Sequence, residues 1–404
     1  MPEQIGVSLS GGGFRSTLFG IGALHFLAEA GLNEGVKVVS SVSGGGYANA
    51  TLAAYRIAYS AMTTDEFRDA LLPVVSVLAA EPVNLLGVPS PVVPARLRKR
   101  LWSAVTGIAT DTPLMFAPDD RLHVFCATNV HDGEYLYLTN RYLWNEWLGA
   151  ANTTSMTLEE ATAASAALPP VFPPVPIDTA TFDLGRRPDV PRRLYLVDGG
   201  ITDHLGDEGM DLGLVPPPGM EDPEDEEGGA ADAGAIPSRF KLVIDASVPH
   251  GRRRDLPLAT VPILRTPIPL AGPASAMIRA GRILFGNQTK RHIEELREEF
   301  GAASGAVVSL TTTVGAPSSM ADRSLPLWAP LWRSGVDWDQ AIRVVSGIRT
   351  GPYSVGPEVA SSALLLGYTK TWVALTEVGL IGDFEPELLG PGAQTETRDW
   401  WTLP

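Results

Sequence analysis

Residues 5–15 read IGVSLSGGGFR, and residues 36–47 read VKVVSSVSGGGY. In each stretch a short run rich in apolar and β-branched residues stops at three consecutive glycines. A segment with helical spacing of apolar residues follows each glycine turn, so the chain opens with two strand–turn–helix units. Two such units predict an α/β fold of three layers, α/β/α, with a mostly parallel central sheet. Sites in such folds form at the carboxyl ends of the strands, where both glycine turns lie.

The rest of the chain continues the pattern. Further strands are predicted at 122–128, 135–138, 193–197 and 241–245, and further helices at 158–168, 275–300 and 367–379. Residues 216–237 are rich in proline, glycine and acidic residues and have almost no apolar side chains, which predicts a disordered insertion. We therefore expect a single domain over residues 1–380, interrupted by that insertion, with residues 381–404 as a C-terminal tail.

Composition narrows the classes of function. The net charge is −15, with 31 basic residues against 46 acidic ones, which argues against a nucleic-acid binder because phosphate backbones are held by Lys and Arg. The single cysteine, Cys126, excludes an intrachain disulfide and fits a reducing compartment. No secretory signal and no apolar run long enough to span a bilayer are visible, so we expect a cytoplasmic protein.

Ser43 lies in the second glycine turn, in the segment SVSGG at 41–45. The segment has the shape of a nucleophile elbow, a tight strand-to-helix turn that needs small residues beside the serine. The usual pattern is G-x-S-x-G, and this chain has Ser41 at the first position. A helix N-terminus after Ser43 favours negative charge there. The alternative interpretation is that Ser43 only caps that helix.

The first glycine turn spans Gly11 to Arg15. Consecutive backbone N–H groups of Gly11, Gly12 and Gly13 at the start of a helix can bind an oxyanion or a phosphate. A nucleotide-binding loop is the alternative, but no GK[ST] follows, and the next strand ends in serines instead of a ribose-binding acid. Arg15 could pair with a substrate phosphate or form an ordinary salt bridge.

Asp198 ends the apolar strand LYLV and begins the turn DGG. Its carboxylate is a candidate base, and a turn-forming Asx residue is the alternative. Histidine is the usual base in such chemistry, but none of the six has a sequence setting that favours it. His204, six residues after Asp198, is the best placed of His25, His123, His131, His204, His250 and His292.

The ordered motifs SGGGFR, SVSGG and DGG resemble those of the patatin-like phospholipases, and GGGFR is also similar to the corresponding loop of cytosolic phospholipase catalytic domains. Two further segments resemble the family, ASAALPPVFPPV at 164–175 and LVIDAS at 242–247. The resemblance covers most of residues 5–250. It implies a patatin-like fold and a serine acylhydrolase that cleaves ester-linked acyl chains of phospholipids or related lipids.

The resemblance also implies roles. Ser43 would attack the ester carbonyl, and Asp198 would take its proton directly, which removes the need for a histidine. Gly11, Gly12 and Gly13 would form the oxyanion hole, and Arg15 would orient the substrate phosphate. The turns of the elbow and of the aspartate would need the small residues Ser41, Gly44, Gly45, Gly199 and Gly200. No cofactor and no metal is implied, and no His, Cys or carboxylate cluster has ligand spacing.

A lipid substrate predicts contact with a membrane surface. The apolar, proline-rich residues 71–94 are followed by four basic residues and a tryptophan: Arg96, Arg98, Lys99, Arg100 and Trp102. We expect this stretch to be the peripheral membrane contact, and a solvated basic helix beside a buried one is the alternative. Rival functions are a broader lipid or carboxyl esterase and a non-catalytic relative that binds lipid or nucleotide. No activator can be named from the sequence.

Overall fold

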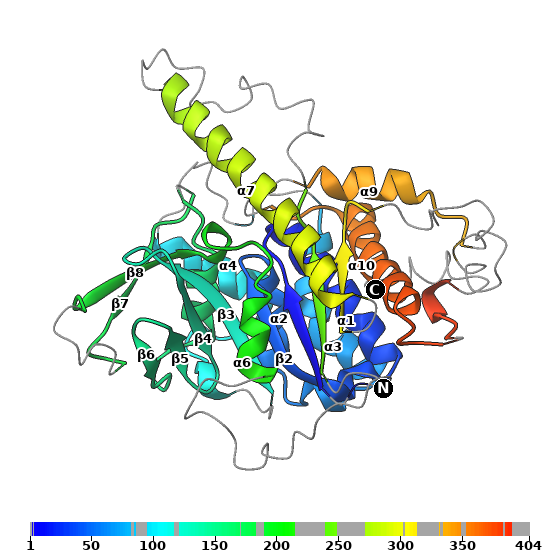
Figure 1. The fold of residues 1–404 in the computed structure, drawn as a ribbon, viewed down its shortest axis with the longest axis horizontal. Coiled ribbons are helices and arrows are strands. Elements are labelled where there is room, and N and C mark those ends of the chain that lie inside the picture. The colour runs from blue at the N-terminus through cyan, green and yellow to red at the C-terminus, as the bar shows by residue number, and fades with distance from the viewer. Residues whose placement is uncertain are drawn as a thin grey trace.

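The computed structural model describes residues 2, 4–81, 85, 95–116, 121–169, 171–182, 190–214, 239–248, 271–301, 304–312, 331, 334–348, 353–382 and 384–389. The predicted insertion at 216–237 lies outside these residues. Figure 1 shows helices packed on both faces of a central twisted sheet. None of the helices in these ranges combines the length and apolar character needed to cross a bilayer.

The sheet has ten strands in the described part of the chain, in the spatial order β10-β9-β1-β2-β3-β4-β5-β6, while β8 pairs with β3 and β7 with β8. These strands are β1 (Gln4–Leu9), β2 (Val36–Val42), β3 (Leu122–Asn129), β4 (Tyr135–Thr139), β5 (Leu143–Asn145), β6 (Gly149–Ala151), β7 (Val175–Asp178), β8 (Arg193–Asp198), β9 (Arg239–Asp245) and β10 (Gly305–Ser309). Pairing is parallel from β10 through β3 and antiparallel beyond it. The predicted α/β class is confirmed, and its parallel half carries both glycine turns.

The helices of the described residues are α1 (Phe14–Glu29), α2 (Gly45–Ala54), α3 (Thr64–Ala79), α4 (Ala95–Thr106), α5 (Leu158–Ser165), α6 (Glu208–Leu214), α7 (Ala271–Phe300), α9 (Trp338–Ser346) and α10 (Pro357–Glu377). The three-layer arrangement follows from two separate cores. Alternate strand residues point to opposite faces, so Leu242 of β9 joins the core shared with α1 and α10, and its neighbour Val243 joins the core under α6 and α7. The sheet is therefore the middle layer.

Several predicted boundaries were incomplete. The helix predicted at 367–379 begins ten residues earlier, at Pro357, because proline is well tolerated in the first turn of a helix. The predicted C-terminal tail packs on the domain as far as the structure describes it: the rings of Phe384 and Phe26 are 5.6 Å apart, and Leu389 is buried. Helices α3, α6 and α9 and strands β5, β6, β7 and β10 were not predicted.

Candidate active site

Ser43 lies between the end of β2 and the start of α2. It has a φ of +52° and is the single non-glycine residue with positive φ among the described residues. This backbone region is strained for residues with a side chain, and such strain is typical of a nucleophile elbow. A Cβ atom on Gly44 would lie well under 3.0 Å from the carbonyl oxygen of Gly13, and one on Gly45 would lie 2.5 Å from that of Leu9. The turn therefore requires glycine at both positions.

Ser41, which replaces the usual glycine of the elbow pattern, points into a buried polar network. Its hydroxyl donates to the carbonyl oxygen of Val124 at 3.0 Å and accepts from the side-chain amide of Asn49 at 2.9 Å. Asn49 in turn is hydrogen-bonded through Oδ1 to His123 Nδ1 at 2.7 Å. Serine in place of glycine at position 41 therefore leaves no buried hydroxyl without a partner, and the elbow geometry stays intact.

Asp198 lies directly against Ser43. The Ser43 hydroxyl donates to Asp198 Oδ2 at 2.7 Å, although the two residues are 155 positions apart in the chain. The cause is the pairing on β3: Val42 of β2 pairs with Cys126, and Asp198 of β8 pairs with the next residue, Ala127. Because β2 is parallel and β8 antiparallel to β3, the carboxyl ends of both strands meet at one point.

The Asp198 carboxylate is buried, with 3% of the residue exposed. Burial raises its pKa, while the hydrogen bonds from Ser43 and Gly200 and the nearby His204 act in the opposite direction. The Gly200 N–H donates to Asp198 Oδ1 at 2.9 Å, so each carboxylate oxygen accepts one hydrogen bond. A Cβ on Gly199 would collide with the carbonyl oxygen of Cys126. A buried carboxylate with a raised pKa is suited to accept a proton near neutral pH.

The glycine loop lies beside this pair. The side-chain hydroxyl of Thr17, in the first turn of α1, donates to the Gly44 carbonyl at 2.7 Å and ties the loop to the elbow. Gly12 and Gly13 both have positive φ, 143° and 66°. The Gly11 N–H donates to the carbonyl oxygen of His204 at 2.9 Å. Of the three predicted oxyanion donors, Gly11 is therefore already engaged, whereas the N–H groups of Gly12 and Gly13 have no hydrogen-bond acceptor among the described residues.

Arg15 does not extend toward an open substrate site. The residue is 5% exposed, and its guanidinium donates to the backbone carbonyls of Ala246 at 2.8 Å and Ile348 at 3.3 Å. These contacts tie the glycine loop to the end of β9 and to the segment after α9. The structure thus gives Arg15 a loop-positioning role in place of the predicted phosphate contact, because a buried guanidinium satisfied by carbonyls is not presented to a headgroup.

An apolar pocket opens beside Ser43 and contains about 490 Å³ of empty space, part of it open to solvent. Gly13, Ser43 and Gly44 form one side of it. The remaining lining is almost entirely apolar: Phe14, Tyr47, Leu101, Ala166, Leu168, Val171 and Phe172. Such a lining suits a hydrocarbon chain.

The predicted membrane stretch on α4 is partly wrong. Trp102 is buried, with its ring 6.2 Å from that of Tyr47, because the apolar face of α4 packs on the core. Arg98 forms a salt bridge at 3.2 Å with Glu159, whose side chain is fully buried. Lys99 and Arg100 are exposed, and the Arg96 side chain lies outside the described residues. Only Lys99 and Arg100 are shown to be available for a surface contact.

Sequence reasoning missed several residues that support the pair. Ser165 accepts the Ser43 N–H at 2.9 Å, and the Thr128 hydroxyl donates to the carbonyl of Asp198 at 3.0 Å. Ser165 lies in the segment 164–175 that carried the family resemblance, so that segment was the available signal. Thr128 had none, because its contact depends on the pairing of β3 with β8.

The hydrogen bond of the Ser43 hydroxyl does not involve a histidine of the described residues. The Ser43 hydroxyl donates to Asp198, and the ring of His204 lies against Gly11 and Gly200. His25 is buried against Tyr368, His131 stacks on Trp147, and His292 contacts two aspartates. His250 lies outside the described residues.

Sheet, elbow and serine–aspartate contact together define an α/β protein with the layout of a serine acylhydrolase. Residues 7–206, which contain the glycine loop, Ser43 and Asp198, match the family model of the patatin-like phospholipases. This segment, residues 7–206, is therefore what connects the chain to that family.

Structural comparison gives more distant likenesses. Human GIVD cytosolic phospholipase A2 has a TM-score of 0.49 and 12% identity, with 98% of this chain and 60% of that chain covered. Its complex with methyl γ-linolenyl fluorophosphonate has a TM-score of 0.47 and 14% identity, with 99% and 59% covered. This chain thus spans about three fifths of the length of those proteins. Comparison with curated protein sequences found no significant match.

Proposed function

We propose that this protein is a serine acylhydrolase that cleaves ester-linked acyl chains of phospholipids or related lipids. The observation that carries the proposal is the 2.7 Å hydrogen bond from the Ser43 hydroxyl to buried Asp198, at the mouth of an apolar pocket. The pocket supports an acyl chain as the recognised part of the substrate. The match of residues 7–206 to the patatin-like phospholipases supports a lipid ester. A phospholipase A reaction, in which a glycerol-linked acyl chain is released, is the specific activity proposed.

In the proposed mechanism the Ser43 oxygen attacks the ester carbonyl while Asp198 takes the hydroxyl proton. The carbonyl oxygen becomes an anion, which the N–H groups of Gly12 and Gly13 stabilise. Collapse of this intermediate breaks the ester bond, and Asp198 returns the proton to the departing alcohol. The acyl chain stays on Ser43 until a water molecule, deprotonated by Asp198, attacks the acyl-enzyme and releases the fatty acid.

Covalent labelling tests the nucleophile. A fluorophosphonate probe with a long alkyl chain is expected to modify wild type at Ser43, identified by mass spectrometry of the labelled peptide. Ser43→Ala should not be labelled. Ser103→Ala is a useful control because it removes an exposed hydroxyl on α4 and keeps the nucleophile. Labelling of Ser43→Ala at the wild-type rate would show that another residue is the nucleophile. A wild type that is not labelled would contradict the proposed acylhydrolase activity.

The exposed residues Lys99 and Arg100 are proposed to contact a membrane. They directly precede Leu101, which lines the pocket beside Ser43, so a lipid surface held by these two cations would lie near the pocket. Basic residues near anionic headgroups contribute about 1 kcal/mol each. Peripheral membrane contact and a cytoplasmic location both remain predictions.

The double variant Lys99→Glu/Arg100→Glu is expected to bind vesicles of anionic phospholipid at least about tenfold more weakly than wild type, since two attractions become repulsions. Hydrolysis of a water-soluble short-chain ester should stay unchanged. Sedimentation with vesicles measures the first quantity and a spectrophotometric assay the second. Lys290→Glu/Arg291→Glu makes the same change of charge at two exposed positions of α7. Equal loss of vesicle binding in both double variants would contradict a contact specific to α4.

A further inference from the structure

The segment 199–207 between β8 and α6, called here the aspartate loop, contacts three parts of the candidate active site. At its start, the Gly200 N–H donates to the Asp198 carboxylate. Near its end, the His204 carbonyl accepts the Gly11 N–H of the glycine loop at 2.9 Å, and the Gly206 carbonyl accepts the Ser40 hydroxyl of β2 at 2.6 Å. The position of this loop therefore decides how the aspartate and the oxyanion donors lie relative to each other.

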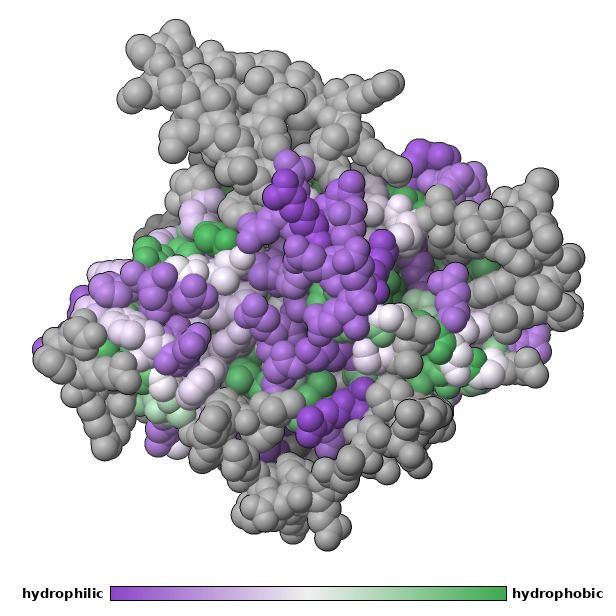
Figure 2. Space-filling view, in the orientation of Figure 1, coloured by the Kyte–Doolittle hydropathy of each residue, from purple (hydrophilic) through white to green (hydrophobic). Residues whose placement is uncertain are grey.

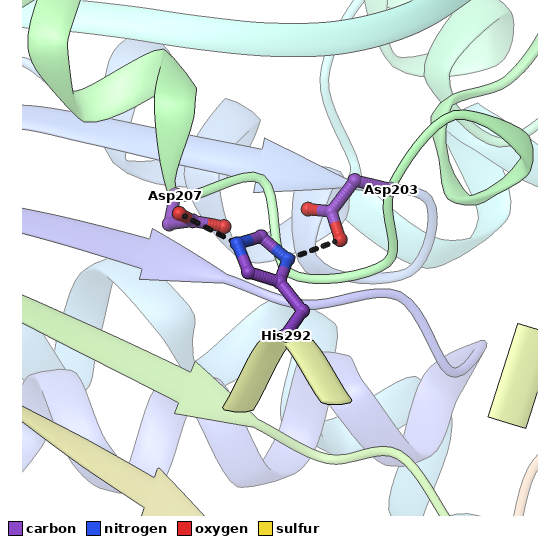
Figure 3. A group of neighbouring side chains, drawn as sticks. All are labelled: Asp203, Asp207 and His292. Carbon is purple, nitrogen blue, oxygen red and sulfur yellow. Dashed lines mark hydrogen bonds and ion pairs between the residues drawn. The ribbon is translucent and has the colours of Figure 1, made fainter. Parts of the chain in front are cut away.

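His292 of α7 holds the aspartate loop from outside the site. Figure 3 shows its ring between two carboxylates of the loop, with one ring nitrogen directed at each. The distance from Nδ1 to Asp203 Oδ1 is 2.9 Å, and that from Nε2 to Asp207 Oδ2 is 3.3 Å. The second oxygen of Asp203 accepts the N–H groups of Leu205 and Gly206. The two aspartates flank His204, so the contact with His292 fixes the part of the loop that meets Gly11.

A charged ring fits this geometry. Both ring nitrogens face carboxylate oxygens, and a ring protonated on both nitrogens can donate to each of them. The two aspartates raise the pKa of His292 to about 10, and the contact lowers the pKa of Asp203. Glu208, at the start of α6, also interacts with this charge. The ligand atoms of Asp203, Asp207 and His292 lie within 4.8 Å of one another, which is also close enough to hold a metal ion. With both ring nitrogens protonated, the three side chains form an ion triad.

Helix α7 provides a firm support for this contact. Its inner face buries Ile293, Leu296 and Phe300 in the core under α6. From residue 287 on, its outer face is hydrophilic and contributes to the purple area in Figure 2. Gln288, one turn before His292, donates to the Thr202 carbonyl at 3.4 Å. The loop is thus held against a helix anchored independently of the active site.

We propose that His292 is a positioning residue for the Ser43–Asp198 pair: as a bridging cation it holds the aspartate loop against α7 and, through His204 and Gly11, keeps the glycine loop in register with the elbow. The inference rests on the proposed acylhydrolase function.

The test compares His292→Gln with wild type on a water-soluble ester over a range of pH. Loss of the bridge should lower kcat by about 10- to 100-fold, because small displacements of reacting groups have effects of that size, while KM changes less than about twofold because the apolar pocket is untouched. Removal of the cation leaves the Asp203 and Asp207 carboxylates uncompensated in the loop that follows Asp198, so the acid limb of the pH–rate profile should move to higher pH. His292→Arg keeps a cation with several donors and should recover part of kcat.

Lys290→Gln is the matched control, since it removes one cation from the exposed face of the same helix and should leave kcat and the acid limb unchanged. Should His292→Gln not fold, Asp207→Asn removes one side of the same bridge and supplies the comparison. A labelled wild type together with wild-type kcat and pH profile in His292→Gln overturns this inference alone, whereas a wild type that is never labelled at Ser43 overturns the proposed function. Wild-type activity that is abolished by a chelator and restored by Ca²⁺, Mn²⁺ or Zn²⁺, with no such response in His292→Gln, would replace the ion triad with a metal site.

Discussion

Asp198→Asn is expected to lower kcat for a soluble ester by about 10⁴-fold while the protein stays folded. The asparagine oxygen can still accept the hydrogen bond from Ser43, but an amide cannot take up the proton, so the nucleophile is no longer activated. Ser43→Ala should lose at least as much kcat. The double variant should have about the kcat of the less active single variant, because the two residues act as a unit. Steady-state kinetics of the three variants measure this. More than a tenth of wild-type kcat in Asp198→Asn would exclude the proposed base.

The same carboxylate fixes the direction of the pH dependence. Burial raises the pKa of Asp198 above the usual aspartate value of about 3.9. Activity should therefore be lost as pH falls through that raised pKa, since a protonated carboxyl cannot accept the serine proton.

The same raised pKa affects the stability of the fold. The folded state holds this proton more tightly than the unfolded state, so the stabilising contribution of the neutral form is present at acid pH and is lost as pH rises through the folded pKa. Asp198→Asn keeps a neutral side chain, and thermal melts at neutral pH should show equal or greater stability than wild type.

Gly44→Ala is expected to reduce kcat/KM by at least about 100-fold and to lower the melting temperature clearly. The added methyl group would overlap the backbone carbonyl of Gly13, and backbone cannot move aside as a flexible side chain can. Either the elbow or the glycine loop must shift, which displaces Ser43 from the oxyanion donors and costs about 1–3 kcal/mol of stability or more.

Gly46→Ala is the control for this change. It lies two residues later in the same glycine run, but its added Cβ would meet Phe125 and Thr162 at 3.5 Å, an ordinary van der Waals contact. Alanine is also the better residue within a helix, so this variant should keep wild-type kinetics and stability. A similar loss in both variants would mean that any change in the glycine run is harmful and that the close approach of the two loops is not the reason.

The two glycine turns could be predicted because their geometry is local. A strand that stops at small residues before a helix allows few turns, and Ser43 lies at the position where such a turn presents a side chain. The residues alone left Ser43 as nucleophile or helix cap, and Asp198 as base or turn residue. The resemblance to a family decided between them, and the hydrogen bond between the two side chains is consistent with that choice.

The basic stretch on α4 shows why the sequence could not separate exposed residues from packed ones. A run of cations followed by a tryptophan is compatible with a membrane contact or with one face of an amphipathic helix. Which of the two holds depends on what the helix packs against. Arg98 pairs with the buried Glu159 of α5, and sequence spacing cannot predict this pair because the two residues are 61 positions apart. The same applies to Arg15, whose acceptors lie 231 and 333 residues away.

By itself the sequence determined the α/β class, the elbow at Ser43 and the glycine loop, since each follows from short-range sterics and from apolar periodicity. Only the tertiary structure decided that Asp198 meets Ser43, because this contact arises where a parallel and an antiparallel neighbour of β3 end at adjacent residues. It also decided that the Gly11 N–H donates to the His204 carbonyl and that the Arg15 guanidinium donates to backbone carbonyls. The contact of His292 with Asp203 and Asp207 likewise depends on the tertiary structure. Each of these is a contact between elements far apart in the chain, whose free energy depends on burial and distance that no local pattern contains.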